Sequence, residues 1–221
     1  MYRKNTTILG VQCAVLYPDD FEESKNYPAL FVLNGAGSRG NKIDGVVNQN
    51  LFDTVSGFNF VVYIPLCDVN TWFDMYERLL RFVDEVISFP FVDKDRVYVM
   101  GASMGGYCAW QLGMSIPQKL AAIVPICGGG MYWNARRLIN VPVWAFHGEK
   151  DTSVSVEESK KMVELVNAIG GNAKLTIYEN TYHDAWTPTY KNPCVFEWLL
   201  GIKNDNSKEI KDPYIDPKNF G

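Results

Sequence analysis

Short apolar runs alternate along this chain with longer segments of helical periodicity. The apolar runs predict strands at seven places: Gln12–Tyr17, Ala29–Leu33, Asn59–Ile64, Arg96–Met100, Ala122–Ile126, Pro142–Phe146 and Lys174–Tyr178. Several, such as Phe31–Leu33 and Val97–Val99, are continuously apolar, as strands are when helices cover both faces of a parallel sheet. The alternation predicts an α/β fold with a mostly parallel sheet of seven to eight strands and helices on both faces.

Three segments carry the clearest helical pattern. Apolar side chains recur every three or four residues over Met75–Val86, which predicts an amphipathic helix that ends before Pro90. A second helix, ending at Gly170, is predicted to start from the capping box Ser155–Glu158, in which the serine hydroxyl accepts the N–H of Glu158 and the Glu158 carboxylate reaches back. A short last helix is predicted to begin at Pro193 and to run through Leu200 to Gly201. Proline stands in its first turn, and Gly201 stands just past its end.

The length of 221 residues predicts one domain, over residues 1–202. After it the composition changes: residues 203–221 carry four lysines, four acidic residues and two prolines, so we expect an irregular tail. Only Cys127–Val141 separates the strands predicted at 122–126 and 142–146. This segment is too short for a large cap domain.

Charge and cysteine content exclude several classes of protein. With 21 Lys+Arg against 25 Asp+Glu, the chain has no basic excess to neutralise phosphates, which argues against nucleic-acid binding. No run of 18 apolar residues predicts a membrane span, and no signal peptide is visible at the N-terminus. Five scattered cysteines without a C-x-x-C pair argue against a disulfide framework and a zinc site. We expect a cytoplasmic protein with free thiols, although a mature secreted form would look the same.

The clearest chemical motif is Gly101–Gly106, which reads Gly-Ala-Ser-Met-Gly-Gly between a predicted strand and a helical segment. Strand, G-x-S-x-G and helix together make up a nucleophile elbow. The serine of an elbow lies on a sharp, strained turn, where only glycine or a very small residue fits two positions before and after it. The turn would place Ser103 at a helix N-terminus, which favours a developing negative charge.

A serine nucleophile needs a base and an orienting acid. In proteins with a nucleophile elbow, the acid comes after the serine in the sequence and the histidine base comes after the acid. The chain has only two histidines. His183 follows the last predicted strand, and Asp151 lies in the loop after the strand at 142–146, so both are expected at the sheet edge that holds Ser103. The predicted triad is therefore Ser103, Asp151 and His183.

Other residues fit the triad less well. His147 is expected to bind backbone groups of its own turn rather than to take part in catalysis. Asp93 and Asp95 precede their predicted strand and so lie at the opposite sheet edge, and Asp184 is too close to His183 in sequence to accept from its ring.

Acyl transfer also needs backbone N–H groups directed at the oxyanion. The N–H of Met104, directly after the nucleophile, is one candidate. A second donor is expected from the glycine-rich loop Leu33–Gly40 after an apolar strand. This loop lacks the lysine and the spacing of nucleotide-binding motifs, so we expect neither a nucleotide nor a metal or organic cofactor.

These residues resemble the α/β-hydrolase superfamily and, more narrowly, its compact esterases: the phospholipase/carboxylesterase, feruloyl/acetylxylan esterase and polyhydroxybutyrate-depolymerase-like groups. The similarity covers about residues 10–200 and rests on Asn34–Gly37, Pro65–Cys67 leading to Trp72, the elbow, His147–Asp151 and Tyr182–Trp186. It implies the same triad, with the N–H groups of Ala36 and Met104 as the oxyanion hole. These families usually have His-Gly where this chain has Asn34-Gly35.

Aromatic residues make up 14% of the chain, and several fall in loops expected near the triad: Trp72, Tyr132, Trp133 and Trp186. Flat aromatic walls suit sugar rings or phenolic acyl groups, although each ring could also be packed beneath a loop. The sequence thus predicts a serine carboxylesterase that acts on short-chain or aromatic acyl esters, including small-molecule or oligosaccharide esters. A peptidase or lactone hydrolase on the same fold, or a non-catalytic binding module, remains the alternative.

Overall fold

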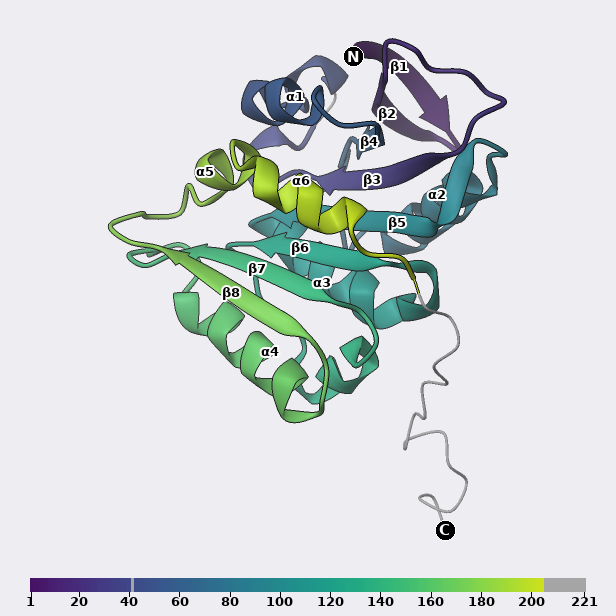
Figure 1. The fold of residues 1–221 in the computed structure, drawn as a ribbon. Coiled ribbons are helices and arrows are strands. Elements are labelled where there is room, and N and C mark those ends of the chain that lie inside the picture. The colour runs from purple at the N-terminus through teal and green to yellow at the C-terminus, as the bar shows by residue number, and fades with distance from the viewer. Residues whose placement is uncertain (41, 205–221) are drawn as a thin grey trace.

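An eight-stranded sheet forms the centre of the molecule in the computed structural model, which describes residues 1–40 and 42–204 (Figure 1). The strands are β1 Tyr2–Ile8, β2 Val11–Tyr17, β3 Tyr27–Leu33, β4 Val61–Pro65, β5 Val92–Ala102, β6 Ala122–Ile126, β7 Val143–Gly148 and β8 Ala173–Tyr178. Their order across the sheet is β1-β2-β4-β3-β5-β6-β7-β8. β1 and β2 pair antiparallel, β2 pairs antiparallel with β4, and the other neighbours are parallel. The predicted mostly parallel α/β sheet is confirmed.

Helices cover both faces of this sheet (Figure 1). Side chains of α2 Tyr76–Ser88, α3 Met104–Ser115 and α4 Val156–Ala168 pack on one face. The other face carries α1 Gln49–Val55, α5 Trp186–Tyr190 and α6 Pro193–Leu200. Four short 3₁₀ helices complete the described elements: η1 Ala36–Ser38, η2 Ile43–Gly45, η3 Pro117–Lys119 and η4 Tyr132–Leu138.

Alternation along the central strand β5 supplies both cores. Val97 and Val99 belong to the cluster under α2, α3 and α4, whereas Tyr98 and Met100 belong to the cluster under α1 and α6. All four side chains are fully buried. Because successive residues of a strand point to opposite faces, the apolar run of β5 is explained by helices on both sides.

The structure corrects several expectations. β1 was not predicted, because its mostly polar sequence at the sheet edge leaves its side chains exposed or half-buried. Helix α4 begins with a different cap: the Ser155 hydroxyl accepts from the N–H of Glu157, and the Glu158 carboxylate binds the Tyr132 hydroxyl instead of reaching back. Asp93 and Asp95 lie within β5 rather than before it, but both are in its N-terminal part, where Asp93 pairs with Arg96.

No cap domain covers the carboxyl ends of the strands within the described residues. Only a loop and η4 connect β6 to β7, as expected from the short segment there. The predicted tail over 203–221 lies, from residue 205 on, outside the described part. All five cysteines are unpaired and four are buried, and no described helix is long and apolar enough to span a membrane.

Backbone segments approach one another very closely where β5 passes into α3. A Cβ at Gly101 would lie 2.1 Å from the Gly105 carbonyl oxygen, and one at Gly105 would lie 2.0 Å from the Leu33 carbonyl oxygen. Real Cβ atoms essentially never lie this close to another heavy atom. Glycine at position 101 lets the turn close on itself, and glycine at position 105 lets it pack against β3.

We expect Gly101→Ala to lower the free energy of unfolding by about 3 kcal/mol or more, because the added methyl group must push the backbone apart. Urea unfolding measures the change. Gly57→Ala is the matched control, since a Cβ there would meet only the Thr54 carbonyl oxygen at 3.5 Å, an ordinary contact. Equal stabilities of the two variants would contradict the close approach.

Candidate active site

Ser103 occupies a strained turn between β5 and α3. Its backbone has φ 55° and ψ −117°, a conformation that side-chain-bearing residues rarely adopt. The turn is held by hydrogen bonds on both sides: the Ser103 N–H donates to the Ile126 carbonyl at 2.8 Å, and its carbonyl accepts from the Tyr107 N–H at 3.0 Å. The fixed backbone presents the hydroxyl at the carboxyl edge of the sheet, as the elbow motif predicts.

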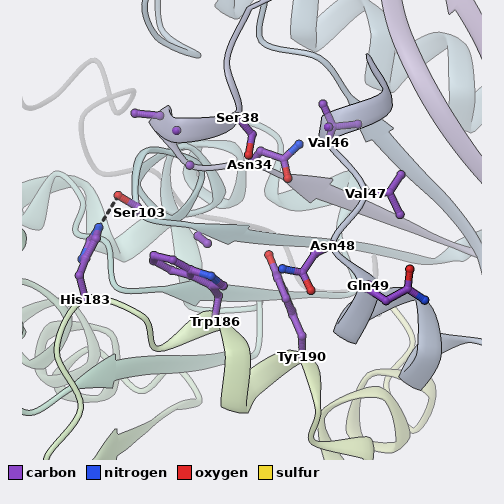
Figure 2. A pocket seen from close by; sticks show the side chains of 15 residues that line it. Asn34, Ser38, Val46, Val47, Asn48, Gln49, Ser103, His183, Trp186 and Tyr190 are labelled. Carbon is purple, nitrogen blue, oxygen red and sulfur yellow. Dashed lines mark hydrogen bonds between the residues drawn. The ribbon is translucent and has the colours of Figure 1, made fainter. Parts of the chain in front are cut away.

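The Ser103 hydroxyl and the carboxylate of Asp151 bind opposite nitrogens of one imidazole ring. His183 Nε2 lies 2.8 Å from Ser103 Oγ, and its Nδ1 lies 2.7 Å from Asp151 Oδ2 (Figure 2 shows the first contact). The structure therefore brings together the three residues that the sequence predicts. Such a series of hydrogen bonds can move a proton from the serine to the imidazole ring and stabilise the imidazolium that results.

The Asp151 carboxylate is held in place by its own loop after β7. Its Oδ1 accepts from the backbone N–H groups of Ser153 at 2.8 Å and Val154 at 2.9 Å, which leaves Oδ2 for His183. Burial alone raises the pKa of this carboxyl, but the hydrogen bonds from Val154, His183 and Ser153 outweigh burial and lower the pKa below its usual value. Asp151 therefore stays ionised at neutral pH.

A second histidine contacts the same carboxylate. The fully buried His147 lies at the end of β7, and its Nε2 is 3.0 Å from the Val154 carbonyl and 3.3 Å from Asp151 Oδ2. Its Nδ1 is 2.7 Å from the Ser159 hydroxyl. The predicted contact with the backbone of its own loop is present, and the contact with Asp151 is an addition that spacing alone did not indicate.

Two backbone N–H groups near the nucleophile donate no hydrogen bond to any described residue. Met104 is the first residue of α3, and Ala36 is the first residue of η1, in the loop after β3. First-turn N–H groups of a helix have no partner inside the helix. The loop that holds Ala36 is itself fixed, because the Trp72 indole N–H donates to the Asn34 carbonyl at 2.9 Å.

A cavity of about 570 Å³ opens beside the Ser103 hydroxyl. One wall is the loop Asn34–Ser38, and the opposite wall is formed by Trp186 and Tyr190 of α5 (Figure 2). The Trp186 ring also meets the His183 ring edge to face, with centroids 5.4 Å apart. The volume of the cavity falls within the range of about 300–1,000 Å³ that is common for small-ligand sites.

The structure corrects part of the expected aromatic wall. Trp72 is fully buried and supports the loop at Asn34 rather than lining this cavity. Trp133 is 66% exposed in η4, and Tyr132 beside it binds Glu158, so neither lines the cavity beside Ser103. Of the four predicted rings only Trp186 does. Sequence reasoning missed Tyr190, Asn48 and Gln49, since their segments carry no recognised motif and reach the cavity only through the fold.

Three potential metal ligands lie close together near the triad: Cys127 Sγ and one atom each of Asp151 and His183, all within 4.8 Å of one another. The Asp151 and His183 atoms already bind each other. Burial raises the pKa of the Cys127 thiol to about 12, so the thiolate that a metal needs is disfavoured. The cluster is therefore better explained by side-chain packing beside the triad than by a metal site.

Comparison with known proteins adds family information to this geometry. A family model described as "Dienelactone hydrolase family" matches residues 71–211. The chain is 23% identical to dipeptidyl-peptidase 5 of Aspergillus fumigatus over 93% of its own length, but it spans only 36% of that relative. It is 26% identical to an acetyl esterase of Caldicellulosiruptor saccharolyticus, over 57% of this chain and 52% of the relative.

Solved structures agree on the fold. A thermostable esterase aligns with a TM-score of 0.77 and 28% identity, covering 91% of this chain and 63% of the esterase. The expected α/β-hydrolase architecture is confirmed.

The burial of His147 predicts a loss of stability in mild acid. Burial lowers the pKa of His147 below its usual value and outweighs the opposing effects of the Val154 carbonyl and Asp151. The unfolded chain therefore binds a proton at this residue at a higher pH than the folded chain does. The contribution of His147 to the free energy of unfolding therefore falls as the pH drops below about 6.5, the ordinary pKa of histidine, by at most about 1.4 kcal/mol per pH unit for one proton.

Urea unfolding of the wild type and of His147→Gln at pH 7.5 and 5.5 measures this effect. We expect the wild type to lose more stability between the two pH values than the variant does, whatever their absolute stabilities. An equal loss in both proteins would show that His147 is not the titrating group.

Proposed function

The chain belongs to the dienelactone hydrolase family, and from this premise we propose that it is a serine carboxylesterase acting through Ser103, His183 and Asp151. The observation that carries the proposal is the continuous hydrogen-bonded chain from the Ser103 hydroxyl through the His183 ring to the Asp151 carboxylate. Its substrates are small-molecule esters of short-chain or aromatic acids. The triad needs no metal or cofactor for this chemistry.

In the proposed mechanism, His183 takes the proton from Ser103 as its oxygen attacks the ester carbonyl carbon. The negative charge that forms on the carbonyl oxygen is bound by the N–H groups of Ala36 and Met104, whose lack of other partners supports this role. His183 then donates its proton to the leaving alkoxide, and an acyl-enzyme remains. Water releases the acid by the same route in reverse.

A peptidase function is the second candidate, because relatives named dipeptidyl-peptidase 5 match this chain. A dipeptidyl peptidase has to recognise the charged N-terminal amine of its peptide. No acidic side chain is among the described residues that line the cavity beside Ser103. The neutral cavity supports an ester more than a peptide with a free amine, and a cyclic ester fits the same chemistry as an open one.

A cytoplasmic location, expected from the scattered cysteines, stays a prediction. The alternative of a non-catalytic binding module would have to leave an assembled triad unused.

Hydrolysis of chromogenic acetyl and butyryl esters tests the proposal. We expect Ser103→Ala to lower kcat at least about 10⁴-fold, because no other group can form the acyl-enzyme. Initial rates at several substrate concentrations give kcat and KM for each variant. Equal rates in the wild type and Ser103→Ala, or none in either, would reject the esterase.

Asp151→Asn should lower kcat by roughly 10⁴-fold, since an amide cannot stabilise the imidazolium and favours the wrong ring tautomer. Asp184→Asn is the matched control. Asp184 is the next residue after His183, but its carboxylate binds the N–H and hydroxyl of Thr187 at the start of α5. We expect this control to keep near wild-type kcat; a similar loss in both variants would contradict the assigned acid.

A further inference from the structure

His147 is a buried titratable group that the mechanism above does not use. Its side chain lies at the end of β7 and is 0% exposed, and Ser159 beside it on α4 is also 0% exposed. Burying an imidazole costs free energy unless its ring nitrogens are hydrogen-bonded, and a phenylalanine would fill a similar space without that cost. Both ring nitrogens of His147 have partners, so the nature of these partners indicates the role of the ring.

The contacts of the ring determine which nitrogen carries its hydrogen. Nε2 lies 3.0 Å from the Val154 carbonyl oxygen and 3.3 Å from Asp151 Oδ2, and both of these oxygens can only accept. A hydrogen on Nε2 satisfies these contacts, whereas a bare nitrogen would be repelled by both oxygens. In the neutral ring, Nδ1 then has no hydrogen and accepts from the Ser159 hydroxyl at 2.7 Å.

One alternative arrangement moves the hydrogen to Nδ1. The Ser159 hydroxyl would then accept from Nδ1 and donate to the Gly128 carbonyl, which lies 2.9 Å away. This arrangement directs the lone pair of Nε2 at a carbonyl oxygen and at the ionised Asp151 carboxylate. Because hydrogen bonds to a charged acceptor are the stronger ones, the form with the hydrogen on Nε2 is favoured.

His147 reaches both oxygens of the Asp151 carboxylate. It contacts Oδ2 directly, at 3.3 Å from Nε2. It reaches Oδ1 through Val154, whose carbonyl accepts from His147 and whose own N–H donates to Oδ1 at 2.9 Å. Val154 lies between β7 and α4 in a segment without helix or strand. These hydrogen bonds therefore supply the support that regular secondary structure does not give there.

The orientation of the carboxylate matters because His183 Nδ1 binds the same Oδ2, at 2.7 Å. A carboxylate that rotated about its side-chain bond would lose this contact and leave His183 without its orienting partner. Rotation is opposed at both oxygens, since two backbone N–H groups hold Oδ1 and His147 contacts Oδ2. Misplacing a group of the catalytic site by about 1 Å can lower turnover on the order of 100-fold.

We propose that His147 is a positioning residue for the ester hydrolysis: its Nε2–H holds the Asp151 carboxylate in the orientation that binds His183. The inference rests on the proposed esterase function and adds one residue to its machinery. His147 is not among the described residues that line the cavity beside Ser103. Its effect therefore falls on kcat rather than on substrate binding.

Two substitutions at position 147 separate the donor from the packing of the ring. His147→Gln keeps an N–H donor near the place of Nε2, whereas His147→Phe keeps a planar ring and has no donor. We expect His147→Phe to lower kcat for a chromogenic acetyl ester roughly ten- to a hundredfold, with KM within about twofold of the wild type. His147→Gln should keep kcat within about threefold of the wild type, because the donor to Asp151 remains.

Tyr98→Phe is the matched control for the loss of a buried hydrogen bond. The Tyr98 ring is also fully buried, and its hydroxyl donates to a backbone carbonyl, that of Ile202, at 2.7 Å. We expect this variant to lose stability in urea but to keep the wild-type kcat. An unchanged kcat in His147→Phe, or an equal loss in His147→Gln and His147→Phe, would overturn the proposal while leaving the esterase intact. Absence of ester hydrolysis by the wild type would instead overturn the esterase itself.

The position of the hydrogen can be measured in the wild-type protein, which avoids any effect of a substitution on folding. The chain has only two histidines, so untagged protein labelled with ¹⁵N in its histidine rings gives signals from two imidazoles. Two-bond ¹H–¹⁵N spectra at pH 7.5 show which nitrogen is protonated, and the spectrum of His183→Gln assigns the remaining ring. We expect His147 to carry its hydrogen on Nε2. A hydrogen on Nδ1 alone would leave no donor for Asp151 and would overturn the proposal.

Discussion

The close approach of bare backbone segments beneath Ser103 is the constraint on which the rest of the site depends. Gly101 lies against the Gly105 carbonyl within the elbow, and Gly105 lies against the end of β3. Gly106 lies so near the Ile126 carbonyl oxygen that a Cβ there would be 2.4 Å from it. A similarly close approach of backbone segments occurs after β7, where a Cβ at Gly148 would lie 2.0 Å from the Tyr182 carbonyl oxygen. The loops that carry Ser103, Asp151 and His183 thus start from positions fixed by backbone packing rather than by adjustable side chains.

This rigid edge gives each polar group of the site a defined partner. Asp151 uses one oxygen for its own loop and the other for His183, and the buried His147 contacts that second oxygen from behind. Trp72 contributes by holding the loop at Asn34, so a residue expected to face substrate supports the site from the core. The N–H groups of Ala36 and Met104 donate to no described residue, and Ala36 lines the cavity together with Trp186 and Tyr190.

Local patterns in the sequence were sufficient to predict most of the sheet and the three residues that the structure brings together at its edge, but not the cavity. Buried strands such as β5 and β6 are apolar on both faces, and the elbow is defined by glycines at fixed spacing, so both can be recognised from short windows. The edge strand β1 is polar and exposed, which removes the pattern that marks a strand. Trp72 and Tyr190 could not be placed, because whether a loop aromatic points inward or toward the cavity depends on distant segments that pack against it.

The central claim is that the strained turn and its histidine make Ser103 a nucleophile. Reaction of the protein with a fluorophosphonate, followed by peptide mass spectrometry, tests this claim most directly, because the reagent reacts preferentially with an activated serine oxygen. We predict one adduct per chain, on Ser103, and none after Ser103→Ala. No adduct on the folded wild-type protein, or an adduct on another residue that persists in Ser103→Ala, would contradict the account and favour a binding module on a hydrolase scaffold.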